Sequence, residues 1–194
     1  MIKYKKQSSL YQDIERFIID SFTKSGDARG IPHFKRTVYW LKKFNPAADE
    51  AMLIAAIAHD IERAFRTKSD ELVKKSEKGF RDDFFLKYHP KKGAEIIGDF
   101  LKERGTDKKL IDRVKMLISK HEVGGNKDQD LLKDADSVSF FENNAEHFVT
   151  KKVQDTSKEK VKEKLDWMFE RITSQDAKKL AEPWYKKAVK KLGH

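Results

Sequence analysis

The sequence predicts an all-α protein, and two observations lead to this prediction. Apolar side chains recur every three to four residues through most of the chain, which is the period of the buried face of a helix. No segment alternates apolar and polar residues in the manner of a half-buried strand. Residues 51–58 contain no polar side chain and are too few to span a bilayer, so we expect a helix buried on every side.

The first half of the chain carries three expected helices and one segment that is harder to assign. Ser8-Ser9 and Asp49 are suited to cap helices, and residues 26–30 form a turn. Residues 67–87 are expected to form a partly helical connection that acts as a lid. The three helices are predicted over about 9–23, 33–44 and 50–65.

The second half of the chain is predicted to be helical as well. His89-Pro90 opens a helix, because proline suits the first helical position, and Gly124-Gly125 closes a helix that ends at His121. Further helices are expected over about 131–141, 157–173 and 176–192. We therefore expect a single domain over 1–194, with a core at about 8–142 and a C-terminal helical extension at about 150–192.

Composition limits the classes of function. The net charge is +10, but 13 basic and 7 acidic residues in 151–194 account for +6 of it. Lysines alternate there with glutamates, which is typical of a solvated helix face, so we do not expect nucleic acid as the main partner. The chain has no cysteine, no recognisable signal peptide and no membrane segment, which predicts a cytoplasmic protein. The sequence predicts no oligomeric state.

A histidine and an aspartate, His59-Asp60, directly follow the buried run. Burial of both groups is costly unless a partner compensates it, and a metal cation is one such partner. Three further histidines lie where an apolar stripe meets an expected helix end, namely His33, His89 and His121. Asp136 lies within an expected helix.

These six residues are enough for two adjacent metal ions with positions left open for water and substrate. A single site could instead use His33, His59, Asp60 and Asp136, with the other two histidines holding substrate or a second ion. The mixed nitrogen and oxygen ligands suit a divalent transition metal, namely Fe, Mn, Zn, Co or Ni.

The order H…HD…H…H…D over about residues 31–141 resembles the HD-domain superfamily of helical metal-dependent phosphohydrolases. The matching segments are His33 with Arg36 and Val38, His59-Asp60, HPKKGAEII from His89, LISKHE with His121, and LLKDADSVSF with Asp136. The resemblance implies an HD-domain-like helical bundle with additional C-terminal helices. It also implies that His33, His59, Asp60 and Asp136 bind the common metal, and that His89 and His121 hold a second one, with Asp60 bridging the two.

The expected function is hydrolysis of a small phosphoester, such as a nucleotide, by attack of a metal-bound hydroxide. Asp60 is the expected catalytic residue. Arg36, Arg63 and Lys92 each lie three residues after an expected ligand, on the same helix face, and are the expected partners of the substrate phosphate. We rank the two arginines above the lysine because a guanidinium binds phosphate in a bidentate manner.

Several neighbouring residues are expected to be structural. Glu62 and Glu122 are interpreted as surface charges, although either could transfer protons. Asp134 is expected to be solvated or hydrogen-bonded, because it lies on another helix face from Asp136. His147 is given no role. Phe80, Phe84 and Phe85 are expected in the core, as are Phe140, Phe141, Trp167 and Trp184.

Two alternatives remain open on the sequence. Some dinuclear proteins with this ligand order resemble diiron oxygenases, and metal identity and O₂ uptake would distinguish them. The chain could also be a non-catalytic helical module that binds an anionic partner through its basic C-terminal helices. In that case, replacing Asp60 with alanine would leave the main function intact, and affinity would fall steeply with salt.

Overall fold

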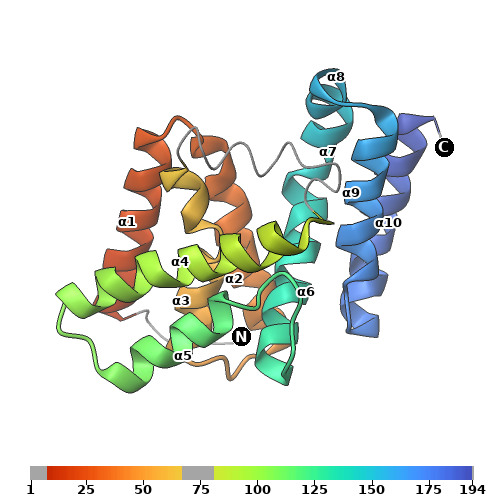
Figure 1. Cartoon of the computed structure of the whole chain (residues 1–194). Coiled ribbons are helices and arrows are strands. Elements are labelled where there is room, and N and C mark those ends of the chain that lie inside the picture. Colours follow the sequence, from red (N-terminus) through yellow and green to blue (C-terminus); the bar gives the residue numbers. More distant parts are fainter. Residues whose placement is uncertain (1–7, 67–80, 194) are drawn as a thin grey trace.

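The computed structural model describes residues 8–66 and 81–193 (Figure 1). Within these two ranges, regular secondary structure is helical and no strand occurs, which confirms the predicted fold class. No helix of these ranges is both long and apolar enough to cross a membrane. Most of the expected lid segment, residues 67–80, lies outside the described residues.

The first three helices lie where they were predicted, and the first and third have the expected caps. They are α1 (Ser9–Lys24), α2 (Ile31–Phe44) and α3 (Glu50–Ala58). The Ser8 hydroxyl accepts a hydrogen bond from the backbone N–H of Tyr11, and the Asp49 carboxylate accepts one from Met52. Helix α3 is shorter than predicted, because the backbone after His59-Asp60 tightens into a 3₁₀ helix over Ile61–Phe65.

The fourth helix, α4 (Asp83–Glu103), starts six residues earlier than predicted. Pro90 therefore lies inside the helix and does not open it, and His89 lies in its second turn. The true start is set by Asp82, whose carboxylate accepts hydrogen bonds from the backbone N–H groups of Phe84 and Phe85. Phe84 is 61% exposed, so the prediction that it belongs to the core was wrong.

Helices α5 (Lys108–Ile118) and α6 (Lys127–Asn143) are joined by the turn that carries His121. Gly124 has a φ of 76°, and a Cβ atom there would clash with the carboxylate of Asp130, so this turn requires glycine. Helix α6 starts four residues before the predicted position, because Asn126 and Gln129 form a capping box.

The C-terminal part continues directly from α6. Residues 145–155 are helical, as α7 (Ala145–His147), a π-helical stretch (Phe148–Lys152) and α8 (Val153–Asp155), which the sequence did not predict. Two longer helices follow where they were expected, α9 (Lys158–Glu170) and α10 (Gln175–Leu192).

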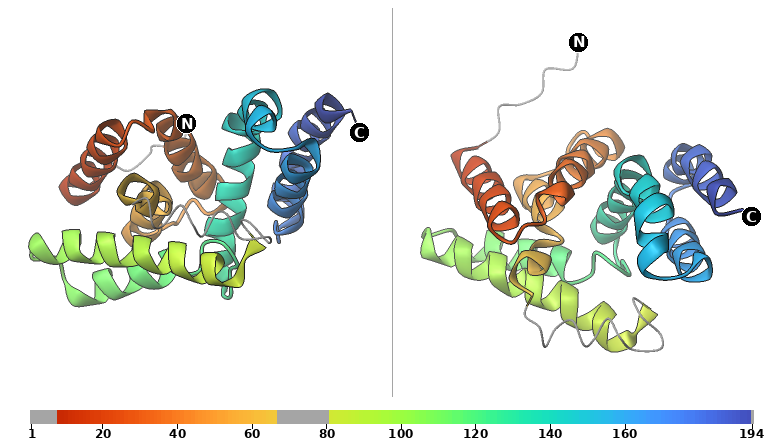
Figure 2. Two further views of the ribbon diagram at one scale, coloured as in Figure 1. Left: turned by 45° about the horizontal axis from the view of Figure 1, so that its top comes forward. Right: turned by 90° about the horizontal axis from the view of Figure 1, so that it is seen from above.

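Helix α6 lies between α1–α3 on one side and α9–α10 on the other (Figures 1 and 2). The buried residues form two clusters, one built mainly from α1–α5 and one from the end of α6 with α9 and α10. Trp40 and Phe44 of α2 pack against both clusters. The long buried helix α6 thus carries one face toward each cluster, and Asp136 lies in its middle.

Candidate metal centre

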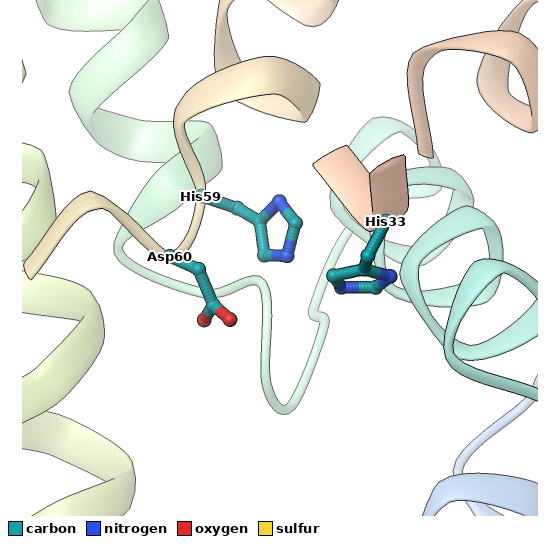
Figure 3. Close-up of side chains that lie close together, drawn as sticks. All are labelled: His33, His59 and Asp60. Carbon is teal, nitrogen blue, oxygen red and sulfur yellow. The ribbon is translucent and has the colours of Figure 1, made fainter. Parts of the chain in front are cut away.

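His59 and Asp60 stand where α3 ends, inside the core. The His59 ring is 1% exposed, and its Nδ1 atom lies 2.9 Å from the carbonyl oxygen of Ala56, to which it donates. The apolar run of α3 fixes the backbone at this point by burial on all sides. At the end of α3, the Nε2 atom of His59 and the carboxylate of Asp60 therefore point into one space (Figure 3). The ring of His33, on α2, faces this space from the other side.

His33 and Asp136 connect α2 to α6. The Ser139 hydroxyl donates to the carbonyl oxygen of His33 at 2.7 Å, so it accepts from Nδ1 of the same histidine at 2.9 Å. This arrangement leaves Nε2 of His33 directed at Asp136, 3.0 Å from Oδ1. The same Oδ1 atom lies 3.3 Å from Nε2 of His59.

His89 and His121 approach Asp60 from α4 and from the turn after α5. His121 is fully buried, and its Nδ1 atom donates to the carbonyl oxygen of Ile118 at 2.9 Å. The Nδ1 atom of His89 lies 2.5 Å from Oε2 of Glu62. The Nε2 atoms of His89 and His121 lie 3.0 and 3.8 Å from Oδ1 of Asp60.

The six expected ligands are therefore brought together around Asp60. Donor atoms of His33, His59 and Asp60 lie within 4.8 Å of one another, and so do donor atoms of Asp60, His89 and His121. Asp60 belongs to both groups, and Asp136 contacts the two histidines of the first. These buried groups could hold metal ions.

The hydrogen bonds of the histidines fit a metal centre. Because Nδ1 of His33, His59 and His121 each donates to an oxygen atom, the Nε2 atom of the neutral ring carries a lone pair. Among the described residues, the buried Nε2 atoms of His59 and His121 make no hydrogen bond. Burial of such an atom without a partner is costly, and both atoms point toward carboxylates, which attract a cation.

Protonation of the histidines can compensate the buried carboxylates only in part. Burial lowers the pKa of His59, but the charges of Asp136 and Asp60 outweigh burial and raise the pKa to about 9. Burial, with repulsion from His59 and His89, lowers the pKa of His121 to about 4. His121 is therefore neutral near pH 7, with an unpartnered Nε2 atom. A metal ion, in contrast, requires neutral imidazole and ionised carboxylate.

Arg171, at the end of α9, closes the cluster from the C-terminal side. Its guanidinium forms ion pairs with Asp136 and Glu122, and its Nε atom donates to the hydroxyl of Ser137 at 2.8 Å. Burial opposes ionisation of Asp136, but the charge of Arg171, followed by that of His59, holds the pKa of this carboxyl well below its usual range.

On the side of the cluster opposite Arg171, Arg63 contacts Asp60 and Glu62 contacts His89. Arg63 donates to Oδ2 of Asp60 at 2.8 Å, which leaves Oδ1 directed at the histidines. Glu62 is 3% exposed and pairs with both His89 and Arg66, so its interpretation as a surface charge was wrong. Glu122 is also buried, through its pair with Arg171, and the same interpretation was wrong there.

The expected phosphate ligands are placed differently. A cavity of about 470 Å³ adjoins the cluster, and Arg63 lines it. Arg36 is not in its lining: both ends of its guanidinium bind Glu142 at 2.7 Å, and its plane stacks on Tyr39. Lys92 is outside it too, with its Nζ atom 3.7 Å from Glu95. Although Arg36 and Lys92 share a helix face with an expected ligand, neither side chain lines the cavity.

Sequence reasoning missed Arg171, Lys164 and Ser139 as neighbours of the site. Arg171 and Lys164 line the cavity, and Arg171 is the one arginine among the 13 basic residues of 151–194, which was a usable signal. His147, to which no role was given, lines the cavity as well. Asp134 is hydrogen-bonded as expected: its two oxygens accept from the backbone N–H groups of Thr173 and Ser174.

Comparison with known proteins identifies a family without an assigned activity. Residues 19–192 match the family described as Domain of unknown function (DUF4202). No curated protein and no solved structure matches the chain.

Proposed function

We propose that this chain, which belongs to the family described as Domain of unknown function (DUF4202), is a dinuclear metal-dependent phosphohydrolase that acts on a small phosphoester. The observation that carries the proposal is the position of Asp60, which two groups of buried histidines share. The order of these residues also resembles that of the HD-domain superfamily, so we propose membership of that superfamily as well.

Two sets of residues would hold the two ions. His33, His59, Asp60 and Asp136 would bind the first, and Asp60, His89 and His121 the second. The mixed imidazole and carboxylate ligands suit Fe, Mn, Zn, Co or Ni. When bound, the ions would acidify water and neutralise charge on phosphoryl oxygens.

The protein itself contributes orientation and charge. Arg63 holds one oxygen of Asp60, so the other oxygen is available to both groups of histidines. Glu62 fixes the ring of His89, and Arg171 fixes Asp136. Because these contacts are buried and charged, they would keep the ligands in one geometry through a reaction cycle.

The adjoining cavity has the polarity that a phosphoester requires. Lys164 lines it, and its Nζ atom lies 5.9 Å from the ring centroid of Phe140. A phosphoryl group at the metal centre would therefore meet a cation on one side, while its organic group would meet an aromatic ring. We propose Lys164 and Arg63, in place of Arg36 and Lys92, as the cationic partners of the phosphoryl group.

Hydrolysis of a phosphoester panel by metal-reconstituted protein tests the proposal. The panel contains p-nitrophenyl phosphate, nucleoside monophosphates and sugar phosphates, each assayed with Mn, Fe, Co, Ni and Zn. We expect phosphate release from at least one ester and a loss of at least about 100-fold in Asp60→Asn, since that change removes the shared charged ligand. Asp99→Asn, an exposed change on α4, should keep full activity.

The alternatives give different results in the same experiment. Iron-loaded protein that consumes O₂ and releases no phosphate from any ester would identify an oxygenase. Protein that takes up none of the five metals, and whose partner binding survives Asp60→Ala, would identify a non-catalytic binding module. Either result would overturn the phosphohydrolase proposal.

A further inference from the structure

The cavity beside the metal centre extends far along two antiparallel helical segments. Arg171, the C-cap of α9, contacts Asp136 of α6. Two turns earlier on α9 and one turn later on α6, the Nζ atom of Lys164 lies 5.9 Å from the ring centroid of Phe140. The cavity lining continues to Lys160 on α9 and to His147 on α7. At about 1.5 Å of rise per residue, Asp136 and His147 are separated by about 16 Å along the helix direction. The cavity is therefore long enough for more than a phosphoryl group.

Two arginines at the inner end of this cavity, beside the metal centre, are already bound by carboxylates. Arg63 pairs with Asp60 and Asp27, each at 2.8 Å. Arg171 pairs with Asp136 and Glu122. Their charges are therefore balanced within the protein, so they orient the site and add little net attraction for a distant part of a ligand.

Cations at the outer end are in excess. Among the described residues, Arg29, Lys152 and Lys160 line this end. Two carboxylates line it with them, those of Glu163 and of Asp27, and Asp27 is already bound by Arg63 at 2.8 Å. The Nζ atom of Lys152 lies 3.6 Å from Asp155, so its charge is partly balanced. The excess thus rests mainly on Arg29 and Lys160.

The guanidinium of Arg29 is held in place at this end. Its Nη1 atom lies 2.8 Å from Nε2 of His147, and because a guanidinium only donates, the imidazole nitrogen accepts. Its Nη2 atom lies 3.8 Å from Asp27, which is a weak ion pair at an exposed position. Arg29 is therefore oriented by the protein while a fork of N–H donors remains for an anionic ligand.

The wall between the two ends is apolar. Phe140, Phe148, Val161 and Met168 line the cavity there, and the rings of the two phenylalanines lie edge to face. Such a wall suits a carbon skeleton and does not favour a chain of phosphates.

We propose that the cavity binds an elongated phosphoester whose organic part ends in a second anionic group, a carboxylate or a phosphate. The second anion binds Arg29 and Lys160 at the outer end, and the carbon skeleton packs on the apolar wall. The placement of the phosphoryl group at the inner end rests on the proposed function.

Binding of three non-hydrolysable probes, measured by calorimetry on metal-reconstituted protein, tests this inference. The first probe is an octyl chain with one terminal phosphonate. The second has a phosphonate at both ends, and the third has a phosphonate at one end and a carboxylate at the other. We expect one or both of the double anions to bind about tenfold more tightly than the single anion, and the tighter of the two identifies the second group.

Variants at the outer end test whether Arg29 and Lys160 cause the tighter binding of the double anions. Combined Arg29→Ala and Lys160→Ala should remove the tenfold preference and leave the affinity of the single anion unchanged. Combined Arg16→Ala and Lys186→Ala remove the same charge at exposed positions outside the cavity lining, and the tenfold preference should survive these two changes. Equal binding of all three probes, or a preference that survives loss of Arg29 and Lys160, would overturn the inference.

Because these measurements need no turnover, they are independent of catalysis. A preference for the double anions in a protein that hydrolyses no ester would refute the phosphohydrolase and retain the two-ended ligand. Hydrolysis of an ester by a protein that shows no preference for the double anions would support the phosphohydrolase and refute the two-ended ligand.

Discussion

Glu62 orients one of the candidate ligands, and its role can be measured at the scale of a single residue. Its carboxylate lies 2.5 Å from Nδ1 of His89 and also pairs with Arg66. A carboxylate behind a ligating histidine fixes the ring and raises its basicity, and loss of such a partner typically lowers metal affinity by about 10–100-fold. We expect this loss for the second ion in Glu62→Ala, measured by competition with a chelator.

The control for this change is Glu95→Ala. Glu95 is a half-exposed carboxylate on α4, 3.7 Å from Lys92, and does not line the cavity. Its removal should leave the affinity of both ions unchanged. If Glu62→Ala binds both ions as tightly as the control variant does, Glu62 is a structural partner of Arg66 and has no role at the metal centre.

The candidate ligands could be proposed from the sequence, whereas the residues that surround them could not. His59-Asp60 follow an apolar run, and burial of such groups demands a partner wherever the chain goes. The direction of Arg36, in contrast, depends on Glu142, a residue 106 positions away that the sequence gives no reason to choose. Long flexible side chains take the partner that the fold supplies, and spacing on one helix does not determine it.

At the scale of elements, Asp134 attaches the C-terminal helices to α6. One of its oxygens accepts from the N–H of Thr173 at 2.8 Å, and the other accepts from that of Ser174, the N-cap of α10, at 2.7 Å. Asparagine can accept only one of these bonds and places a second donor against the other. We expect Asp134→Asn to lower the free energy of unfolding by about 1–3 kcal/mol, because a partly buried backbone N–H group loses its acceptor.

Urea denaturation of this variant, beside Asp99→Asn, measures the effect. Asp99 is exposed on α4, and its change should stay within about 0.5 kcal/mol. A value that small for Asp134→Asn would show that the contact with the α9–α10 connection is energetically neutral.

Helix positions were predictable where a cap and an apolar stripe coincide. Ser8 and Asp49 are N-caps as expected, and the helices after them begin where the sequence placed them. The start of α4 was misplaced because Pro90 is typical of a first turn, yet the cap at Asp82 prevails. Helical structure over 145–155 was missed because Asn143-Asn144 predicted a break.

At the scale of the whole molecule, the two buried clusters should unfold as one unit. Trp40 and Phe44 pack against both clusters, and Arg171 joins α9 to Asp136. Ile54 and Leu165 are fully buried, one in each cluster. We expect Ile54→Ala and Leu165→Ala each to cost about 2–5 kcal/mol, with tryptophan fluorescence and far-ultraviolet circular dichroism following one coincident transition.

Separate transitions would contradict this expectation. If Leu165→Ala shifted an early transition and left a later one unchanged, residues 150–192 would form an independent unit and the predicted single domain over 1–194 would be wrong. The sequence could not settle this point, because amphipathic periodicity shows that α9 and α10 bury a face but does not show against which surface.

The number of metal ions per chain tests the central claim most directly. Protein purified without a histidine tag or chelator, and reconstituted with one transition metal, should contain about two ions per chain. His33→Ala and His89→Ala each remove a ligand from one group only, so each variant should retain about one ion. A wild-type protein that binds no transition metal, or a content that neither substitution changes, would contradict a dinuclear centre built around Asp60.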